Sequence, residues 1–85
     1  MKLLRFHATW CGPCKRFEPV INEFAEKHGI PIEHVDIEQQ PDVASEYNVQ
    51  TVPTTIAFDD AGAVVDVIHG AVPSPVLANR LRDYL

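Results

Sequence analysis

The residues best suited to chemistry in this sequence are Cys11 and Cys14, separated by Gly12 and Pro13, and the chain has no other cysteine. Such a Cys-x-x-Cys pair can be a structural disulfide, part of a metal site or a redox-active dithiol. A structural disulfide that closes so short a loop restrains little of the unfolded chain. A zinc site needs four ligands, and no second cysteine pair is present, although His7 could contribute one. A redox dithiol is therefore the favoured interpretation.

The pair falls between a predicted strand and a predicted helix. Residues 2–7 are rich in apolar side chains and end just before Cys11, where a helical pattern begins. The first turn of a helix has unpaired N–H groups and a positive dipole end, and both stabilise a thiolate. We expect Cys11, exposed beside Trp10, to be the nucleophile and Cys14, buried one turn further on, to be the resolving thiol. Exchange would then pass through a mixed disulfide.

Strands and helices alternate along the rest of the chain. Hydrophobic periodicity predicts strands at 2–7, 31–38, 55–58 and 63–69, and helices at 12–28, 41–48 and from 74 to the C-terminus. The order β-α-β-α-β-β-α predicts an α/β fold with a four-stranded mixed sheet and helices packed on its faces. We expect parallel pairing through both crossovers and an antiparallel hairpin at the end.

The last helix has its own start signal. Ser74 is expected to cap it, with Pro75 at the first helical position. Its predicted apolar stripe consists of Leu77, Leu81, Tyr84 and Leu85.

Composition limits the possible partners. The 85 residues suit one domain, residues 1–85, and a formal net charge of −5 without a concentrated Lys/Arg patch argues against nucleic acid and anionic membrane surfaces. The N-terminus has no apolar run resembling a signal peptide, so we expect a cytoplasmic protein, and a monomer. Thiols stay reduced in the cytoplasm, which further favours a catalytic pair.

The residues also carry a family resemblance. The segment WCGPCK, residues 10–15, resembles the active-site signature of the thioredoxins, and the resemblance continues through Pro19 and residues 35–54 to Gly62 and Gly70. It implies a thioredoxin-like fold and a small protein-disulfide reductase that carries electrons through a Cys11–Cys14 disulfide without a bound cofactor or metal. An external reductase, flavin- and NADPH-dependent, would reduce it. Its targets would be disulfide-containing proteins, with ribonucleotide reductase as one example.

The resemblance also implies a docking surface around Cys11. Thioredoxins carry a cis-proline where this chain has Pro53, and the main chain of Val52 would pair there with an extended substrate segment. From the residues alone, Pro53 could equally begin a strand. The implied surface comprises Trp10, Gly12, Pro13, Val52, Pro53, Gly70 and Ala71.

Two departures separate this sequence from typical thioredoxins. It lacks their N-terminal strand and helix, which makes it glutaredoxin-sized, yet it also lacks the glutaredoxin Cys-Pro-Tyr-Cys motif. Where thioredoxins place a buried aspartate and its lysine partner, it has Arg5 and His34. We expect Arg5 to reach water or to pair with Asp36 or Glu33. Alternatively, Arg5 and His34 tune the site, with a cation beneath it that favours the Cys14 thiolate.

Other functions remain open at this level. The fold could serve as an interaction module without redox turnover, although that role would not need both thiols. A glutaredoxin-like exchange protein or an oxidant of the protein disulfide isomerase type is another alternative. Such oxidants usually carry histidine before the second cysteine, so Pro13 favours the reducing direction.

Overall fold

The computed structural model describes residues 1–85, and its elements follow the predicted order. The strands are β1 (Lys2–His7), β2 (Ile32–Asp36), β3 (Thr54–Phe58) and β4 (Val64–His69). The helices are α1 (Gly12–Lys27), α2 (Pro41–Glu46) and α3 (Ser74–Arg80), followed by a 3₁₀ turn, η1 (Arg82–Tyr84). The fold is the α/β arrangement that the pattern predicts.

The four strands form one mixed sheet in the order β2-β1-β3-β4. β1 runs parallel to β2, whereas β3 is antiparallel to β1 and to β4. The expectation of parallel pairing through the second crossover is therefore wrong. The six residues of α2 rise only about 9 Å. The chain consequently enters β3 at the end of the sheet where β2 stopped, with Thr54 opposite Phe6.

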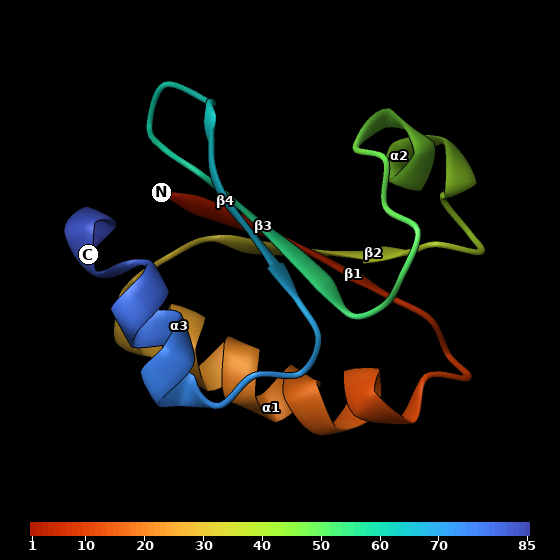
Figure 1. The fold of residues 1–85 in the computed structure, drawn as a ribbon, viewed down its shortest axis with the longest axis horizontal. Coiled ribbons are helices and arrows are strands. Elements are labelled where there is room, and N and C mark those ends of the chain that lie inside the picture. The colour runs from red at the N-terminus through yellow and green to blue at the C-terminus, as the bar shows by residue number, and fades with distance from the viewer.

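The helices cover the sheet unequally, with α1 and α3 on one face and α2 on the other (Figure 1). Because side chains alternate along a strand, β1 contributes Leu3 to the core beneath α1 and α3, and Leu4 and Phe6 to the core beside α2. Phe17 and Ile21 of α1 are fully buried in the first of these cores. This packing holds the start of α1 against the central strand.

The C-terminal helix, α3, ends before the last residues of its predicted apolar stripe. Pro73 occupies the N-cap, so Ser74 is already helical and its side chain makes no capping bond, contrary to expectation. After α3 the chain tightens into η1, whose turn of three residues breaks the helical spacing. Only Leu77 and Leu81 are buried, while Tyr84 and Leu85 are exposed. No helix in the structure combines the length and the apolar character that a membrane crossing needs.

Candidate functional site

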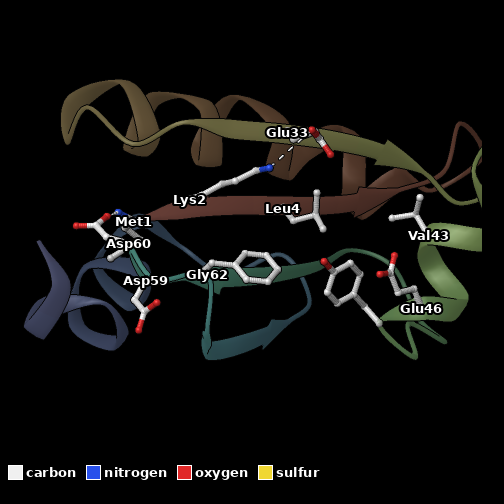
Figure 2. A pocket seen from close by; sticks show the side chains of 11 residues that line it. Met1, Lys2, Leu4, Glu33, Val43, Glu46, Asp59, Asp60 and Gly62 are labelled. Carbon is white, nitrogen blue, oxygen red and sulfur yellow. Dashed lines mark hydrogen bonds and ion pairs between the residues drawn. The ribbon is translucent and has the colours of Figure 1, made fainter.

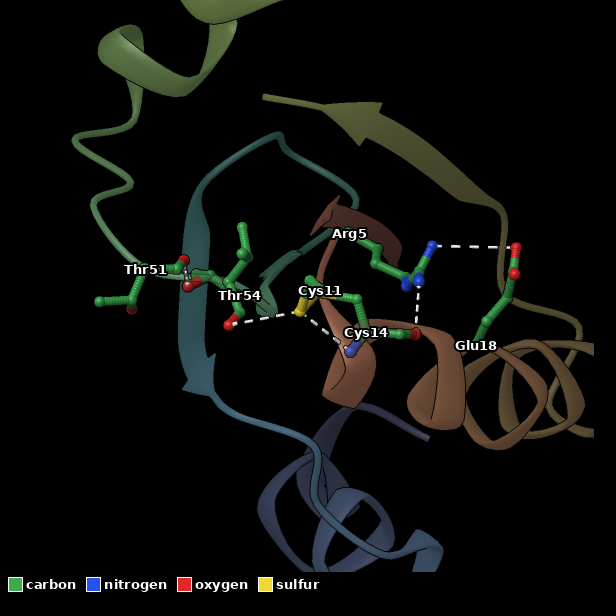
Figure 3. The surroundings of a disulfide bond; sticks show 7 residues. Arg5, Cys11, Cys14, Glu18, Thr51 and Thr54 are labelled. Atoms are coloured by element: carbon green, nitrogen blue, oxygen red, sulfur yellow. Dashed lines mark hydrogen bonds and ion pairs between the residues drawn. A yellow bond between two sulfur atoms is a disulfide. The ribbon is translucent and has the colours of Figure 1, made fainter. Parts of the chain in front are cut away.

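Cys11 and Cys14 form a disulfide at the start of α1, with their Cα atoms 5.2 Å apart. Cys11 is the N-cap of this helix, and its backbone is extended. Its Sγ accepts a hydrogen bond from the backbone N–H of Cys14 at 3.1 Å (Figure 3). The sulfur therefore lies where a helix stabilises negative charge.

The two cysteines are less exposed than their neighbour Trp10. Trp10 is 66% exposed, Cys11 4% and Cys14 1%. The expectation that Cys14 is buried is confirmed, but the expectation of an exposed Cys11 is wrong. Cys11 packs with Ala8 and Cys14, and the side chain of Val52 covers this cluster. Only a small part of Cys11 remains accessible.

The predicted docking residues come from three chain segments that polar contacts connect in turn. Cys11 Sγ lies 3.8 Å from the carbonyl oxygen of Val52. The Val52–Pro53 peptide bond is cis, and the Pro53 carbonyl accepts a hydrogen bond from the Gly70 N–H at 2.8 Å. Gly70 has φ +85°, a conformation that side chains other than glycine rarely adopt. Gly12, Pro13 and Ala71 are exposed.

Arg5 lies beneath the disulfide, and the expectation that it reaches water or pairs with Asp36 or Glu33 is wrong. Its side chain is 2% exposed and is the largest fully buried one in the chain. The reason is its position on the central strand β1, on the face that α1 covers. The guanidinium Nη2 donates a hydrogen bond to the carbonyl oxygen of Cys14 at 2.8 Å (Figure 3).

The other guanidinium nitrogen of Arg5 faces two further groups. Nη1 lies 3.1 Å from Nδ1 of His34 and 3.9 Å from a carboxylate oxygen of Glu18. Arginine can only donate, so His34 must accept through Nδ1 and carry its proton on Nε2. Arg5 and His34 are also direct neighbours in the β1–β2 register. The structure thus brings together the two positions at which the sequence departs from typical thioredoxins.

Burial changes the pKa of both Arg5 and His34. It lowers the pKa of Arg5, and the Glu18 carboxylate opposes that shift. Burial also lowers the pKa of His34, and the charge of Arg5 lowers it further. His34 is consequently neutral at pH 7, as its hydrogen bond from Arg5 requires.

Glu18 is a site residue that the sequence reasoning missed. It lies one helical turn after Cys14, so it shares a face of α1 with that cysteine. Its carboxylate is the one acidic group within ion-pair distance of Arg5. The sequence could have indicated this role, because Glu18 is four residues after Cys14 and a buried Arg5 on the preceding strand would require an acidic partner.

One cavity lies apart from the cysteines. It measures about 630 Å³ and lies on the sheet face beside α2, where Leu4, Val43, Tyr47 and Phe58 meet a charged rim (Figure 2). None of the predicted site residues lines it. No group of three or more histidine, cysteine or acidic side chains is arranged to hold a metal ion.

The arrangement defines the class of protein. A disulfide joins two cysteines at the N-terminus of a helix, on a four-stranded mixed sheet with three helices. A sulfur at a helix N-cap is a good attacking and leaving group in thiol–disulfide exchange. The fold and the site are those of a thiol–disulfide oxidoreductase.

Comparison with known proteins gives the family. The thioredoxin family model matches residues 1–83, and the chain belongs to the thioredoxin family. Thioredoxin 1 of Synechococcus elongatus is 40% identical over 98% of this chain and 78% of its own length. A Staphylococcus epidermidis thioredoxin is 40% identical over 100% of this chain and 83% of its own.

Solved structures agree with this assignment. Thioredoxin 1 of Thermosipho africanus superposes with a TM-score of 0.90 at 27% identity, over 99% of this chain and 93% of that one. A thioredoxin from Nicotiana alata superposes with a TM-score of 0.87 at 35% identity, over 96% of this chain and 70% of that one.

Proposed function

We propose that this protein is a protein-disulfide reductase that carries electrons from an external reductase to disulfide-containing proteins. The observation that supports it most is the sulfur of Cys11 at the N-cap of α1, bonded to the Cys14 N–H. Reduction of the disulfide leaves that N–H and the helix dipole directed at a thiolate. Cys11 is thereby the nucleophile and Cys14 the resolving thiol.

The exchange proceeds in two displacements. The Cys11 thiolate attacks one sulfur of a target disulfide, which forms a mixed disulfide and releases the first target thiolate. The Cys14 thiolate then attacks Cys11 Sγ, which re-forms the Cys11–Cys14 bond and releases the second target thiolate. The target gains two electrons and two protons, and the protein becomes oxidised. An external dithiol or flavin-dependent reductase returns the two electrons.

The partners follow from this cycle. We propose a thioredoxin reductase that draws on NADPH as the donor, and oxidised proteins, including ribonucleotide reductase, as acceptors. A reducing compartment, the cytoplasm in this proposal, keeps the pair in its dithiol form between turnovers. Residues 1–85 act as a single domain and as a monomer in this proposal, without nucleic acid or a membrane.

The docking surface is proposed from the residues that surround Cys11. Trp10, Gly12 and Pro13 flank the cysteine in the chain, the Val52 carbonyl oxygen lies against its sulfur, and Gly70, followed by Ala71, bonds to the buried Pro53. In this proposal the main chain of Val52 pairs with an extended target segment, and Trp10 contributes apolar contact area.

Trp10→Ala tests the docking surface. Loss of an exposed aromatic anchor should raise the KM for insulin about tenfold, because such anchors contribute about 1.4 kcal/mol or more to an interface. Reduction of the small substrate hydroxyethyl disulfide should change less than about twofold, since it needs no docking surface. Tyr84→Ala is the control, because Tyr84 is an exposed aromatic residue on η1, outside the predicted docking surface. Equal effects of Trp10→Ala on both substrates would contradict the proposal.

The direction of electron flow is tested by equilibrating the protein with defined mixtures of reduced and oxidised glutathione. A reductase should lie near the thioredoxin range, about −270 mV, whereas an oxidant lies near −120 mV. The oxidised and reduced fractions are measured by thiol alkylation and mass spectrometry, and NADPH-coupled turnover with a thioredoxin reductase follows. A potential near −120 mV would make the protein an oxidant and end the proposal.

A further inference from the structure

We infer that Arg5 is a positioning residue for the second displacement, in which its buried guanidinium favours the thiolate form of Cys14. This inference rests on the proposed function, because it concerns the resolving step of that cycle. The step raises a chemical problem: Cys14 must be a thiolate to attack, and burial, which leaves it 1% exposed, disfavours the charged form. The charged side chain that hydrogen-bonds to Cys14 is the cation Arg5, at the position where the resemblance to thioredoxins would place a carboxylate base.

The contact between Arg5 and Cys14 supports the inference directly. Nη2 of Arg5 donates to the carbonyl oxygen of Cys14 at 2.8 Å, so the charge lies against the residue that carries the resolving sulfur. Arg5 is 2% exposed and Cys14 is 1% exposed. Little solvent can screen the interaction, and a cation close to a thiol favours the ionised form.

The surroundings of Arg5 compensate its charge only in part. Two titratable side chains lie against the guanidinium, His34 on β2 and Glu18 on α1, and His7 on β1 lies against the ring of His34. His34 accepts a hydrogen bond as a neutral ring, so it holds the guanidinium without cancelling its charge. Glu18 is 3.9 Å away and 53% exposed, so water weakens its attraction.

One donor of the guanidinium is also unsatisfied. Nε of Arg5 is buried and has no hydrogen-bond partner in the oxidised state. A buried donor without a partner is costly, and negative charge nearby reduces that cost. This unsatisfied donor adds to the positive potential around Cys14, in the direction that favours its thiolate.

The resolving step then needs no buried base. The Cys14 thiol releases its proton to solvent, and the thiolate attacks Cys11 Sγ of the mixed disulfide. The Cys11–Cys14 bond forms, the Cys11–target bond breaks, and the departing target thiolate takes up a proton. Arg5 raises the fraction of Cys14 that is ready to attack at pH 7.

The test follows the release of thionitrobenzoate when the reduced protein reacts with stoichiometric 5,5′-dithiobis(2-nitrobenzoate) in a stopped-flow instrument. Attack by Cys11 releases the first equivalent, and displacement by Cys14 releases the second. The rate of the second phase as a function of pH reports the ionisation of Cys14 in the mixed disulfide. The rate of the first phase as a function of pH reports the ionisation of Cys11 in the same experiment.

Arg5→Met should move the pH midpoint of the second phase upward by about one unit, because a nearby opposite charge that solvent screens little shifts a titration by about that much. The second phase at pH 7 would be roughly tenfold slower, since the thiolate fraction falls tenfold per pH unit below the midpoint. The first phase should stay within about twofold. Arg5→Lys keeps the cation and should recover most of the shift. Arg80→Met is the matched control, because Arg80 pairs with Asp66 on the surface.

Glu18→Gln should move the pH midpoint of the second phase downward, in the direction opposite to Arg5→Met. This test does not depend on how well Arg5→Met folds. It removes the opposing charge from an exposed position, so the second phase should become about twofold faster at pH 7. A midpoint that is unchanged in Arg5→Met, or that rises in Glu18→Gln, would overturn the role of Arg5. Release of only one equivalent by the unaltered protein would instead overturn the proposed function, because no resolving step would then occur.

Discussion

Cys11→Ser should reduce dithiothreitol-dependent insulin reduction to the rate of dithiothreitol alone, a loss of roughly 10³-fold or more. The hydroxyl of serine does not ionise near neutral pH, so no nucleophile remains at the N-cap of α1. We expect no substitution by Cys14, because it is 1% exposed and lies within α1 rather than at its N-cap. The measurement is the turbidity of precipitating insulin B chain.

Cys14→Ser is the matched comparison for this prediction. It retains the attacking thiol and loses the resolving one, so it should trap mixed disulfides with target proteins that are visible on a non-reducing gel. Cys11→Ser should trap none. Full insulin turnover by Cys11→Ser would show that another group performs the attack, and the two-displacement cycle would have to be abandoned.

Phe17→Ala should lower the free energy of unfolding by about 3–5 kcal/mol. Phe17 is 1% exposed and lies in the core cluster beneath α1, together with Leu3 and Ile21. Truncation removes its burial and leaves a cavity at the helix turn that follows Cys14. A domain of this length has a total stability of roughly 4–13 kcal/mol, so the loss is a large fraction of it.

Urea unfolding of the oxidised protein measures this effect. Val64→Ala is the control, because Val64 is 51% exposed on β4 and should cost less than about 1 kcal/mol. A loss below about 1 kcal/mol for Phe17→Ala would contradict the packing of α1 on the sheet. The same variant should keep both thiols reactive where it remains folded, which separates stability from chemistry.

Local sequence patterns were sufficient to predict most of the strands and helices of the fold. Apolar alternation and helical spacing predict every strand and helix in order, because one face of each element must be buried. The strand–helix junction at Cys11 predicts the chemistry for the same local reason, since the helix N-terminus is a property of the adjacent backbone. These features depend on neighbours within a few residues, so they can be inferred without the tertiary structure.

Features that depend on distant residues could not be inferred in this way. β3 runs antiparallel to β1 because α2 is too short to carry the chain back to the opposite end of the sheet. The small exposure of Cys11 depends on Val52, which is 41 residues away along the chain. The two sheet faces are covered by different helices, and sequence alone does not say which helix covers which face.

Arg5 shows the difference most clearly. The residue types show that a cation stands where the resemblance expects a carboxylate, on the strand before Cys11, and that His34 stands at the partner position. The burial of this cation against the Cys14 carbonyl, with Glu18 and His34 around it, emerges from the folded chain alone. Burial follows because β1 is an inner strand of the sheet and α1 packs over its Arg5 face, so elements distant in the sequence exclude solvent from it.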